Sequence, residues 1–561
     1  MSATPVYLKP VPDWEEHEKP TLPGSPSMPW HPPWIRVAYA CIALLVGITG
    51  GLGNALVTAN LPVIQGQMGL TPAQAAWLPA AFVMVNVTAN LLVFKVRQQY
   101  GIRLFAEIGL GVYAALTVLH LFAGSFESMV LLRAASGLAG AACSTLAVLY
   151  MLQALPREYT GKLLVVGVGI SQLAIPLAWI LSPSLVGDGT WHMLYLFEAG
   201  LALCSFAAVV VLKLPPGVHI RVIERMDFLT FALMATAVAL IVAVLAQGYV
   251  RWWFDTPWLA WLLVGAIVLM TLSFAIEHNR KNPLIQTWWL FSGPAIRFII
   301  GAFLIRFLTT EQSFGTVSML RTLGMAPEQM QPLFVVILIG TIVGIAASAL
   351  SFGPKTMIPQ ILLAIVLIGS AGWLDQHRTS LDRPEDFFLS QFLLSVGAGM
   401  FMGPLILIGI MQALKQGIDH VVTFIVTLSM TQVMAGLAGS AVLSTYQLHQ
   451  ERLHSAALTA QLDPGDAVVA QRLRLQQQIY AGVISDPVLR SAQGTAQLAQ
   501  VVRREANVRA YNDVFRLSGR IAVGFLLWSL LLTIRTALRN RKASAPSASA
   551  PAVAAASTGS S

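Results

Sequence analysis

The chain has 561 residues, of which 56% are hydrophobic and only 11% are charged. Soluble domains carry about 25% charged residues, so this composition argues against a soluble enzyme. Lys and Arg outnumber Asp and Glu by 35 to 26, which in an apolar chain is typical of cytoplasmic loops rather than a nucleic-acid surface. Cys41, Cys143 and Cys204 all lie in apolar runs, which excludes a disulfide framework and disfavours a cysteine metal site.

A membrane-spanning helix needs about 20 mainly apolar residues. Fourteen segments meet this requirement and predict an all-α, polytopic membrane protein: 36–59, 74–94, 102–123, 126–153, 161–184, 192–213, 228–248, 256–277, 293–316, 331–352, 356–375, 386–413, 419–446 and 518–538. The first run follows 35 polar, proline-rich residues and lacks a small-residue cleavage pattern, so we interpret it as a helix rather than a signal peptide.

Basic residues set the orientation of the chain. With the N-terminus in the cytoplasm, the inside segments hold twenty Lys and Arg residues and the short outside loops hold four. Both termini are therefore predicted to be cytoplasmic. Residues 1–35 and 543–561 are predicted to be disordered tails because of their composition. The polar segment 447–517 shows helical spacing and is too long for a connector, which predicts a helical excursion on the outer side.

Several local motifs have a recognisable order along the chain. LLRAASGLAGAA (131–142) places Gly137 and Gly140 after Arg133, TANLPVI ends the first helix, and WLPAAFVM (77–84) opens the second. Asp227 opens the seventh helix, and IEHNRKNPLI (276–285) closes the eighth. With fourteen helices, these motifs resemble the fourteen-helix drug:proton antiporter family of the major facilitator superfamily, in particular its Emr-type exporters.

The resemblance covers about residues 36–538. It implies a six-plus-two-plus-six arrangement, with six-helix halves at 36–213 and 293–538 and two inserted linker helices at 228–277. It also implies structural roles for Arg97, Gly101 and Arg103 after the second helix and for Pro176 in the fifth.

The sequence also departs from this family at three places. Gln98 stands where the loop after the second helix has an Asp, and Gly53 stands where the first helix has one. Of the fifth-helix antiporter signature, only Pro176 is kept. These losses leave the predicted fold intact and weaken the inference of antiport.

Ionisable residues inside a bilayer cost about 2.5–3.5 kcal/mol on insertion scales, so those within the predicted spans are functional candidates. Arg133 shares a helix face with Gly137 and Gly140, and the resemblance links it to proton coupling; alternatively it pairs with backbone carbonyls. Glu198 is our first candidate for the proton carrier, because an apolar cavity disfavours its charged form; a permanent pairing with an Arg is the alternative.

Arg306 and Glu311 lie on one helix, about 140° apart, so each needs a partner elsewhere. Glu311 is a candidate for proton or substrate handling, or it reaches the interface, and Arg306 is a candidate for attracting anionic substrates.

Uncharged polar residues give a weaker signal. Asn54, Asn86 and Gln172 are candidates for lining a substrate cavity, although hydrogen bonding between helices explains such residues equally well. Gly399, Gly403 and Pro404 predict a close-packed seam or hinge.

These observations predict a transporter and not an enzyme. The chain has no phosphate-binding Gly-Lys-Ser/Thr loop and no His pair at zinc spacing, so we expect the proton gradient to be the energy source, with no cofactor and no metal. We expect a bacterial inner-membrane exporter of small apolar or weakly acidic aromatic compounds, working by alternating access, with no nucleic-acid partner. The resemblance implies a periplasmic adaptor and an outer-membrane channel as partners. A proton-coupled importer of an organic acid remains an alternative, whereas an integral-membrane enzyme or receptor is disfavoured.

Overall fold

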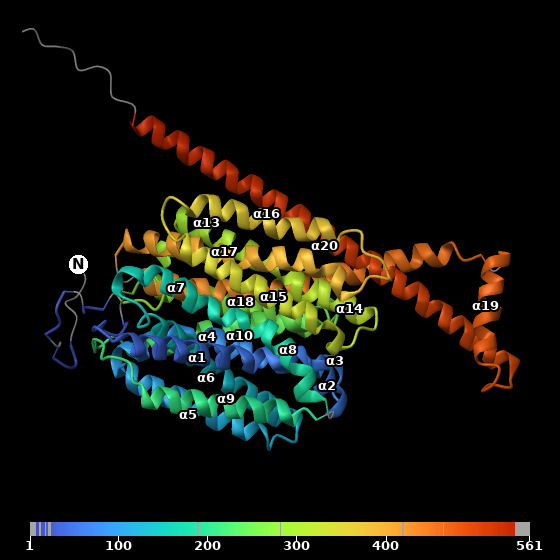
Figure 1. Cartoon of the computed structure of the whole chain (residues 1–561), viewed down its shortest axis with the longest axis horizontal. Coiled ribbons are helices and arrows are strands. Elements are labelled where there is room, and N and C mark those ends of the chain that lie inside the picture. The colour runs from blue at the N-terminus through green and yellow to red at the C-terminus, as the bar shows by residue number, and fades with distance from the viewer. Residues whose placement is uncertain are drawn as a thin grey trace, which may run out of the picture.

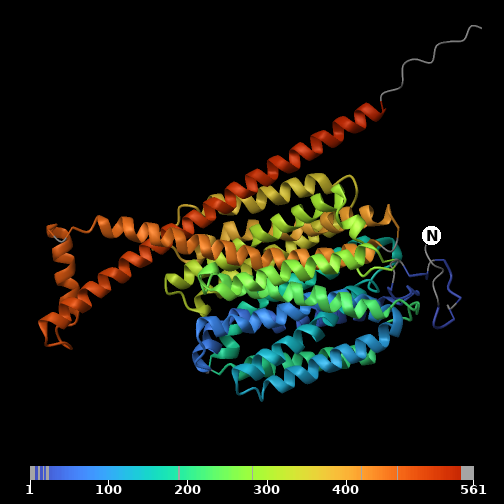
Figure 2. The same ribbon diagram turned by 180° about the vertical axis from the view of Figure 1, so that it is seen from behind.

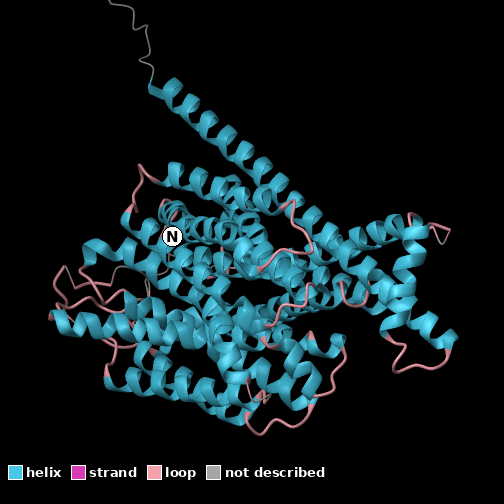
Figure 3. Cartoon of the chain, turned by 45° about the vertical axis from the view of Figure 1, so that its right-hand side comes forward, coloured by secondary structure: helices cyan, strands magenta, loops and turns pink. Residues whose placement is uncertain are grey.

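The computed structural model describes residues 7–10, 13–16, 18–20, 24–187, 190–280, 282–417, 420–463 and 465–544. Most of this part of the chain is helical, and Figure 3 shows no strand in it. Its extended pairings are two isolated bridges, Tyr7 with Ile220 and Pro26 with Gly217. The prediction of an all-α protein is confirmed.

Fourteen helical stretches are long and apolar enough to cross a membrane, as the sequence predicts. The first six contain α1 (Pro33–Ala59), α4 (Trp77–Tyr100), α5 (Ile102–His120), α6 (Phe126–Met151), α7 (Thr160–Gly169) continuing into α8 (Ala174–Val186), and α9 (His192–Val211). Two more are α10 (Arg225–Gly248) and α11 (Pro257–His278). The last six contain α13 (Gly293–Thr310) with η4 (Glu311–Thr316) and α14 (Val317–Thr322), α15 (Pro327–Leu350), α16 (Met357–Asp375), α17 (Phe388–Leu414), α18 (His420–Ala460) and α20 (Pro487–Ser544). Short helices between or beside them are α2 (Leu61–Gln67), α3 (Pro72–Ala75), η1 (Arg157–Tyr159), η2 (Ile170–Leu173), η3 (Trp253–Asp255), α12 (Thr287–Leu290), η5 (Pro384–Phe387) and α19 (Ala467–Ile479).

The same helix pairings occur in both halves. In the first half α4 packs on α6 and α5 packs on α9; in the second, α15 packs on α17 and α16 packs on α20. Across the interface between the halves, α8 contacts α15 and α4 contacts α18. Linker helix α10 packs against α4 and α18, one helix from each half, and α11 packs on α10. The six-plus-two-plus-six arrangement is therefore confirmed.

The two ends of the bundle differ. In Figure 1 the N-terminus and the C-terminal end of α20 lie at the left, whereas α19 projects from the right. Figure 2 shows the same projection from behind. The excursion 447–517 consists mainly of extensions of α18 and α20 beyond the bundle, with α19 between them. The first described residues and the C-terminal end of α20 therefore lie at the end opposite this excursion, as the distribution of basic residues predicts.

Part of the N-terminal segment packs against the bundle, although its composition predicts disorder. Residues 25–28 are buried. The Ser27 amide donates to the Pro216 carbonyl at 3.0 Å, and the Gln153 amide donates to the Ser27 carbonyl at 3.1 Å. These hydrogen bonds use backbone groups of the N-terminal segment, which a prediction of disorder from composition does not take into account. Of the predicted C-terminal tail 543–561, residues 545–561 lie outside the described part of the chain.

A buried ion cluster joins the linker helices to the first half at the cytoplasmic end. The Lys95 Nζ atom lies 2.8 Å from Asp227 Oδ2, and Arg280 Nη2 lies 2.7 Å from Asp227 Oδ1. Arg280 also pairs with Glu277 at 2.7 Å and with Glu224 at 3.0 Å. The Asp227 side chain is 0% exposed, and those of Lys95 and Arg280 are each 10% exposed. The negative charge of Asp227 therefore balances two buried positive charges, those of Lys95 on α4 and of Arg280 after α11.

Replacing this carboxylate should destabilise the whole protein. In D227N, Lys95 and Arg280 lose a shared counter-ion, and removing one partner of a buried pair typically costs about 3–5 kcal/mol. We expect a clearly lower thermal midpoint for the detergent-solubilised variant than for the wild type. Asp255 is exposed, so D255N is the matched control and should melt like the wild type. Equal midpoints for D227N and D255N would contradict the role assigned to the cluster.

Candidate functional site

Arg133 on α6 is fully buried and engages α1 and α4. Its Nη1 atom donates to the Gly53 carbonyl at 2.6 Å, and its Nη2 atom donates to Asn54 Oδ1 at 2.7 Å. Its Nε atom donates to the Leu78 carbonyl at 3.4 Å, and the guanidinium lies 4.8 Å from the centroid of the Phe82 ring. Backbone carbonyls, an amide oxygen and an aromatic face thus solvate this cation, so it holds three helices together.

Glu198 on α9 lies on the other side of Gly53. It is 2% exposed, and its Oε1 atom accepts a hydrogen bond of 2.8 Å from the Tyr113 hydroxyl on α5. A Cβ atom added at Gly53 would lie 2.6 Å from Glu198 Oε1 and 2.2 Å from the Tyr113 oxygen. Only glycine leaves room here. The carboxylate of α9 therefore occupies the space that a side chain on residue 53 would enter.

Arg133 and Glu198, the two first-ranked candidates from the sequence, thus meet at one residue. Arg133 binds the Gly53 carbonyl, whereas Glu198 lies against the Gly53 Cα. Among the described residues no direct ion pair joins them, so the Gly53 peptide separates the two charges. Gly53, which departs from the family pattern, is the contact point of the site.

Three aromatic or imidazole side chains complete this site, and the sequence analysis missed all of them. Tyr113 binds Glu198, and the His120 ring stacks on Tyr195 with centroids 4.6 Å apart. His120 is 1% exposed, and its Nε2 atom has no hydrogen-bond partner among the described residues. A lone Tyr in an apolar run and a His near a helix end resemble ordinary packing or interface residues, so no sequence signal singles them out. Another histidine, His192 at the start of α9, is exposed and stacks on Trp191.

Glu311 lies apart from this cluster, in the second half. It begins the π-helical segment η4, is 1% exposed, and its Oε1 atom lacks a hydrogen-bond partner in the described structure. Its neighbour Gln312 donates to Ser395 Oγ at 2.9 Å and to Gln391 Oε1 at 3.3 Å. Glu198 and Glu311 are therefore separate buried carboxyl groups, one in each half.

The predicted substrate-binding residues lie between helices and are half-buried. Asn54 is occupied by Arg133, and Asn86 donates to the Gly137 carbonyl at 3.1 Å. Gln172 lies in η2, where the fifth span is kinked. Arg306 lies beside Gly436 of α18, with no acidic partner within the described ranges.

The predicted structural glycines lie where helix backbones touch. A Cβ atom at Gly137 would lie 2.3 Å from the Phe82 carbonyl oxygen, and Gly140 faces the Phe82 ring. At Gly399 a Cβ atom would meet the α15 backbone at 2.8 Å, and the Gly403 amide donates to Ser348 at 3.0 Å. The remaining predicted residues of this kind, Pro176 in α8 and Pro404 in α17, are both buried.

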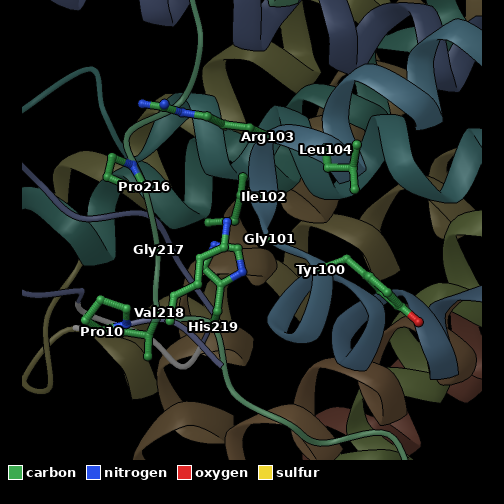
Figure 4. A pocket seen from close by; sticks show the side chains of 11 residues that line it. Pro10, Tyr100, Gly101, Ile102, Arg103, Leu104, Pro216, Gly217, Val218 and His219 are labelled. Carbon is green, nitrogen blue, oxygen red and sulfur yellow. The ribbon is translucent and has the colours of Figure 1, made fainter. Parts of the chain in front are cut away.

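A cavity of about 300 Å³ lies at the cytoplasmic turn between α4 and α5, and its lining does not include Gly53, Arg133 or Glu198. Figure 4 shows His219 against Gly101, while Arg103 extends toward Pro216. Gly101 has φ +93°, and a Cβ atom there would lie 2.3 Å from the His219 ring. Arg103 donates to the Leu214 carbonyl at 2.8 Å, and Arg97 is buried nearby. This cavity is thus part of a tight turn and lies apart from Glu198 and Glu311.

Two repeated six-helix halves, with ionisable groups buried inside each, define the class: a multi-pass membrane transporter. The chain belongs to the Major Facilitator Superfamily, whose sequence pattern matches residues 43–439.

Two relatives agree with this assignment. Over 459 residues the chain is 22% identical to the fatty acid resistance protein FarB of Neisseria gonorrhoeae, covering 78% of this chain and 87% of FarB. Over 500 residues it is 21% identical to the multidrug export protein EmrB of Haemophilus influenzae, covering 86% of this chain and 92% of EmrB. The resemblance to Emr-type exporters is therefore confirmed.

Solved structures share the fold. A structure from work on proton-dependent oligopeptide transporters gives a TM-score of 0.54 at 12% identity, covering 90% of this chain and 99% of that one. The human organic anion transporter MFSD10 gives 0.51 at 13% identity, covering 88% of this chain and all of that one.

The close contact at Gly53 gives a direct test of the site. In G53A the new methyl group must displace Glu198 or Tyr113, and overpacking of this kind typically costs about 1–3 kcal/mol. We expect a lower thermal midpoint in detergent. Nothing lies within 4 Å of a Cβ atom at Gly66, so G66A should melt like the wild type. A G53A variant as stable as G66A would mean that Glu198 does not lie against Gly53.

Proposed function

We propose that this protein is a proton-driven exporter of small apolar or weakly acidic aromatic compounds in a bacterial inner membrane. The observation that carries the proposal is that Glu198 and Arg133 both contact Gly53, Glu198 at the Cα atom and Arg133 at the carbonyl oxygen. A buried carboxyl group near, but not paired with, a cation can exist in both charge states, which a proton-coupled carrier requires. The energy source is the proton gradient, without a cofactor.

Contacts between the halves suggest how this site is coupled to transport. At the outer end, Arg321 of α14 donates to the Ala59 carbonyl of α1 at 2.8 Å. The rings of Trp179 and Phe334 stack nearby with centroids 4.6 Å apart, joining α8 to α15. Gly53 and Ala59 lie on the same helix, less than two turns apart. Loading a proton on Glu198 changes the charge at α1, and α1 carries a contact that must break when the outer side opens.

The proposed substrate class is based on the environment of Arg306. Arg133 is solvated by protein groups, whereas Arg306 lies between α13 and α18 with no acidic partner among the residues described. A desolvated guanidinium favours a weakly acidic group on the substrate. The names of the two relatives, a fatty acid resistance protein and a multidrug export protein, agree with an apolar cargo and with outward transport.

Inverted membrane vesicles with an acidic lumen test coupling, direction and substrate class together. An exporter should accumulate 2-naphthoate in the lumen as protons leave, and it should prefer this acid to the matched cation N-methylquinolinium. In E198Q the amide still accepts from Tyr113 but binds no proton, so we expect proton-driven accumulation to fall at least tenfold. Glu127 is exposed on the same side, and E127Q should transport normally.

Three results would contradict the proposal. Normal accumulation by E198Q would assign the proton to another residue. Preference for the cation would overturn the substrate class, and proton-driven loss of preloaded 2-naphthoate from the lumen would support an importer. A swap sharpens the test: G53D in an E198A background places a carboxyl group near the vacated space and should restore part of the coupling.

We further propose that the outer excursion binds a periplasmic adaptor of a tripartite export system. The excursion projects from the outer end of the bundle (Figures 1 and 2), and α19 carries exposed apolar side chains at helical spacing. Val468, Leu475 and Ile479 are 70%, 56% and 73% exposed. Between 467 and 479 the charged side chains are Arg472 and Arg474, so the partner surface should be apolar with an acidic rim.

Removing this apolar stripe should weaken the complex without unfolding the bundle. We expect the triple variant V468S/L475S/I479S to co-purify with a co-expressed Emr-type adaptor at least tenfold less efficiently than the wild type. Leu381 is also exposed on an outer loop, so L381S serves as the control. Unchanged co-purification of the triple variant would count against docking on α19.

A further inference from the structure

The C-terminal half contains a buried carboxyl group that the mechanism above does not use. Glu311 begins η4, the π-helical turn that interrupts the ninth span, and such turns are often found at functional sites. Ser518 of α20 faces the carboxyl group. Glu311 Oε1 has no hydrogen-bond partner among the described residues, and the Ser518 hydroxyl is the polar group placed to bind the carboxyl group. An ionised carboxylate in this setting would be costly, so the group requires either a proton or an unseen partner.

The surroundings of Glu311 parallel those of Glu198. Each carboxyl group lies between the first, third and sixth helices of its half and against a glycine. A Cβ atom added at Gly372 of α16 would lie 3.3 Å from Glu311 Oε2. In the first half, a Cβ atom added at Gly53 would lie 2.6 Å from Glu198 Oε1. In the first half the acid comes from the sixth helix, whereas in the second it comes from the first.

The fourth helix of each half binds the residue next to the carboxyl site. Arg133 of α6 donates to Asn54, which follows Gly53, and Gln391 of α17 accepts from Gln312, which follows Glu311. The cation of the first half is therefore replaced by a neutral amide in the second. Glu311 has no cation in the place where Glu198 has Arg133.

A chain of polar groups leads from Glu311 to the outer surface. Asp375 ends α16 one turn beyond Gly372, and it interacts electrostatically with Glu311. Its Oδ2 atom accepts from Gln391 at 3.1 Å, and its Oδ1 atom lies 2.6 Å from Arg378. Arg378 in turn lies 3.6 Å from Asp382, whose side chain is partly exposed. Glu311 and Asp375 are thus buried, whereas the side chains of Arg378 and Asp382 are 16% and 19% exposed.

The other ionisable groups on the elements that pack against Glu311 lie against other neighbours. On α20, Asp513 pairs with Arg516 and with His454 of α18, and Tyr511 lies next to the Phe314 ring. Arg306 on α13 lies beside Gly436. Arg321 on α14 binds the Ala59 carbonyl. Tyr446 on α18 packs with Phe307 and Leu443. Asp375 is therefore the nearest ionisable group with a connection to the surface.

We infer that Glu311 is a second proton-binding site, loaded from the outer side through the carboxyl group of Asp375, with Arg378 as the counter-ion of Asp375. Only the use of this proton in transport rests on the proposed function. The inference that Glu311 binds a proton rests on the geometry of its surroundings. Each half then carries one titrating carboxyl group, and the protein can move one more proton per cycle than Glu198 alone would allow. A proton passes between carboxyl oxygens and the outer solution, so no bond other than O–H forms or breaks.

Infrared difference spectroscopy on the purified full chain in lipid tests proton binding without a substrate. We expect pH-induced C=O bands of protonated carboxyl groups in the wild type, one lost in E311Q and a different one lost in E198Q. Glu328 is exposed on the outer side, so E328Q should leave the spectrum unchanged. An E311Q spectrum identical to that of the wild type would overturn the inference.

The proposed route has its own measurement. After transfer to D₂O, the Glu311 band should shift at least tenfold more slowly in D375N than in the wild type, while the Glu198 band should shift at the same rate in both. This comparison also controls for folding, because a misfolded D375N protein would exchange faster at both sites. Unchanged exchange at Glu311 would exclude the route through Asp375.

Transport separates this inference from the proposed function. In inverted vesicles E311Q should still accumulate 2-naphthoate but move one proton fewer per molecule. Wild-type vesicles that fail to accumulate 2-naphthoate, combined with the expected spectra, would refute the exporter and leave the second proton site standing. Normal accumulation with an unchanged proton ratio in E311Q would refute the use of the second site in transport.

Discussion

The arrangement of the first half depends on how a buried guanidinium is solvated. A charged side chain inside a bilayer is tolerated only where the protein replaces its hydration shell. Arg133 obtains that replacement from two backbone carbonyls, the Asn54 amide oxygen and the face of Phe82. Such contacts require α1, α4 and α6 to approach closely, which the small residues at Gly137 and Gly140 permit. The packing of three helices and the position of the carboxyl site thus follow from one cation.

The sequence predicts the fold well because the bilayer imposes strong constraints. Spans need long apolar runs, and basic residues mark the cytoplasmic side, so helix number and orientation can be read directly. It also identifies Arg133, Glu198 and Glu311, since ionisable residues in apolar runs are conspicuous. The distances between them depend on packing between helices far apart in sequence. From the sequence alone, Gly53 is therefore interpreted as the loss of the acidic residue that the family has in the first helix. In the structure, the carboxyl group of Glu198 on α9 lies against Gly53.

The burial of Asp375 and Asp227 could not be predicted from the sequence, for a different reason. Both lie at helix ends, where an acidic residue ordinarily reaches water, and sequence alone gives no reason to expect burial. In the structure both side chains are fully buried, because each has a neighbouring arginine that comes from outside the spans. Asp227 explains how the linker helices are held at the cytoplasmic end: α10 is bound to α4 through Lys95 while it also packs against α18. In the proposed alternating-access cycle, the ion pair would keep α10 with α4, whereas no ion pair among the described residues joins α10 to α18.

That asymmetry bears on the proposed proton-driven cycle. Arg133, Gly53 and Glu198 all belong to the first half, so a rigid-body motion leaves the site intact in both states. The contact from Arg321 to Ala59, in contrast, joins the two halves and must break when the outer side opens. Since α1 carries both Gly53 and Ala59, a change of charge at the site biases the gate through the position of α1 rather than through loss of the site itself. A proton carrier placed this way can remain loaded throughout the motion, which is the condition for coupling proton entry to export.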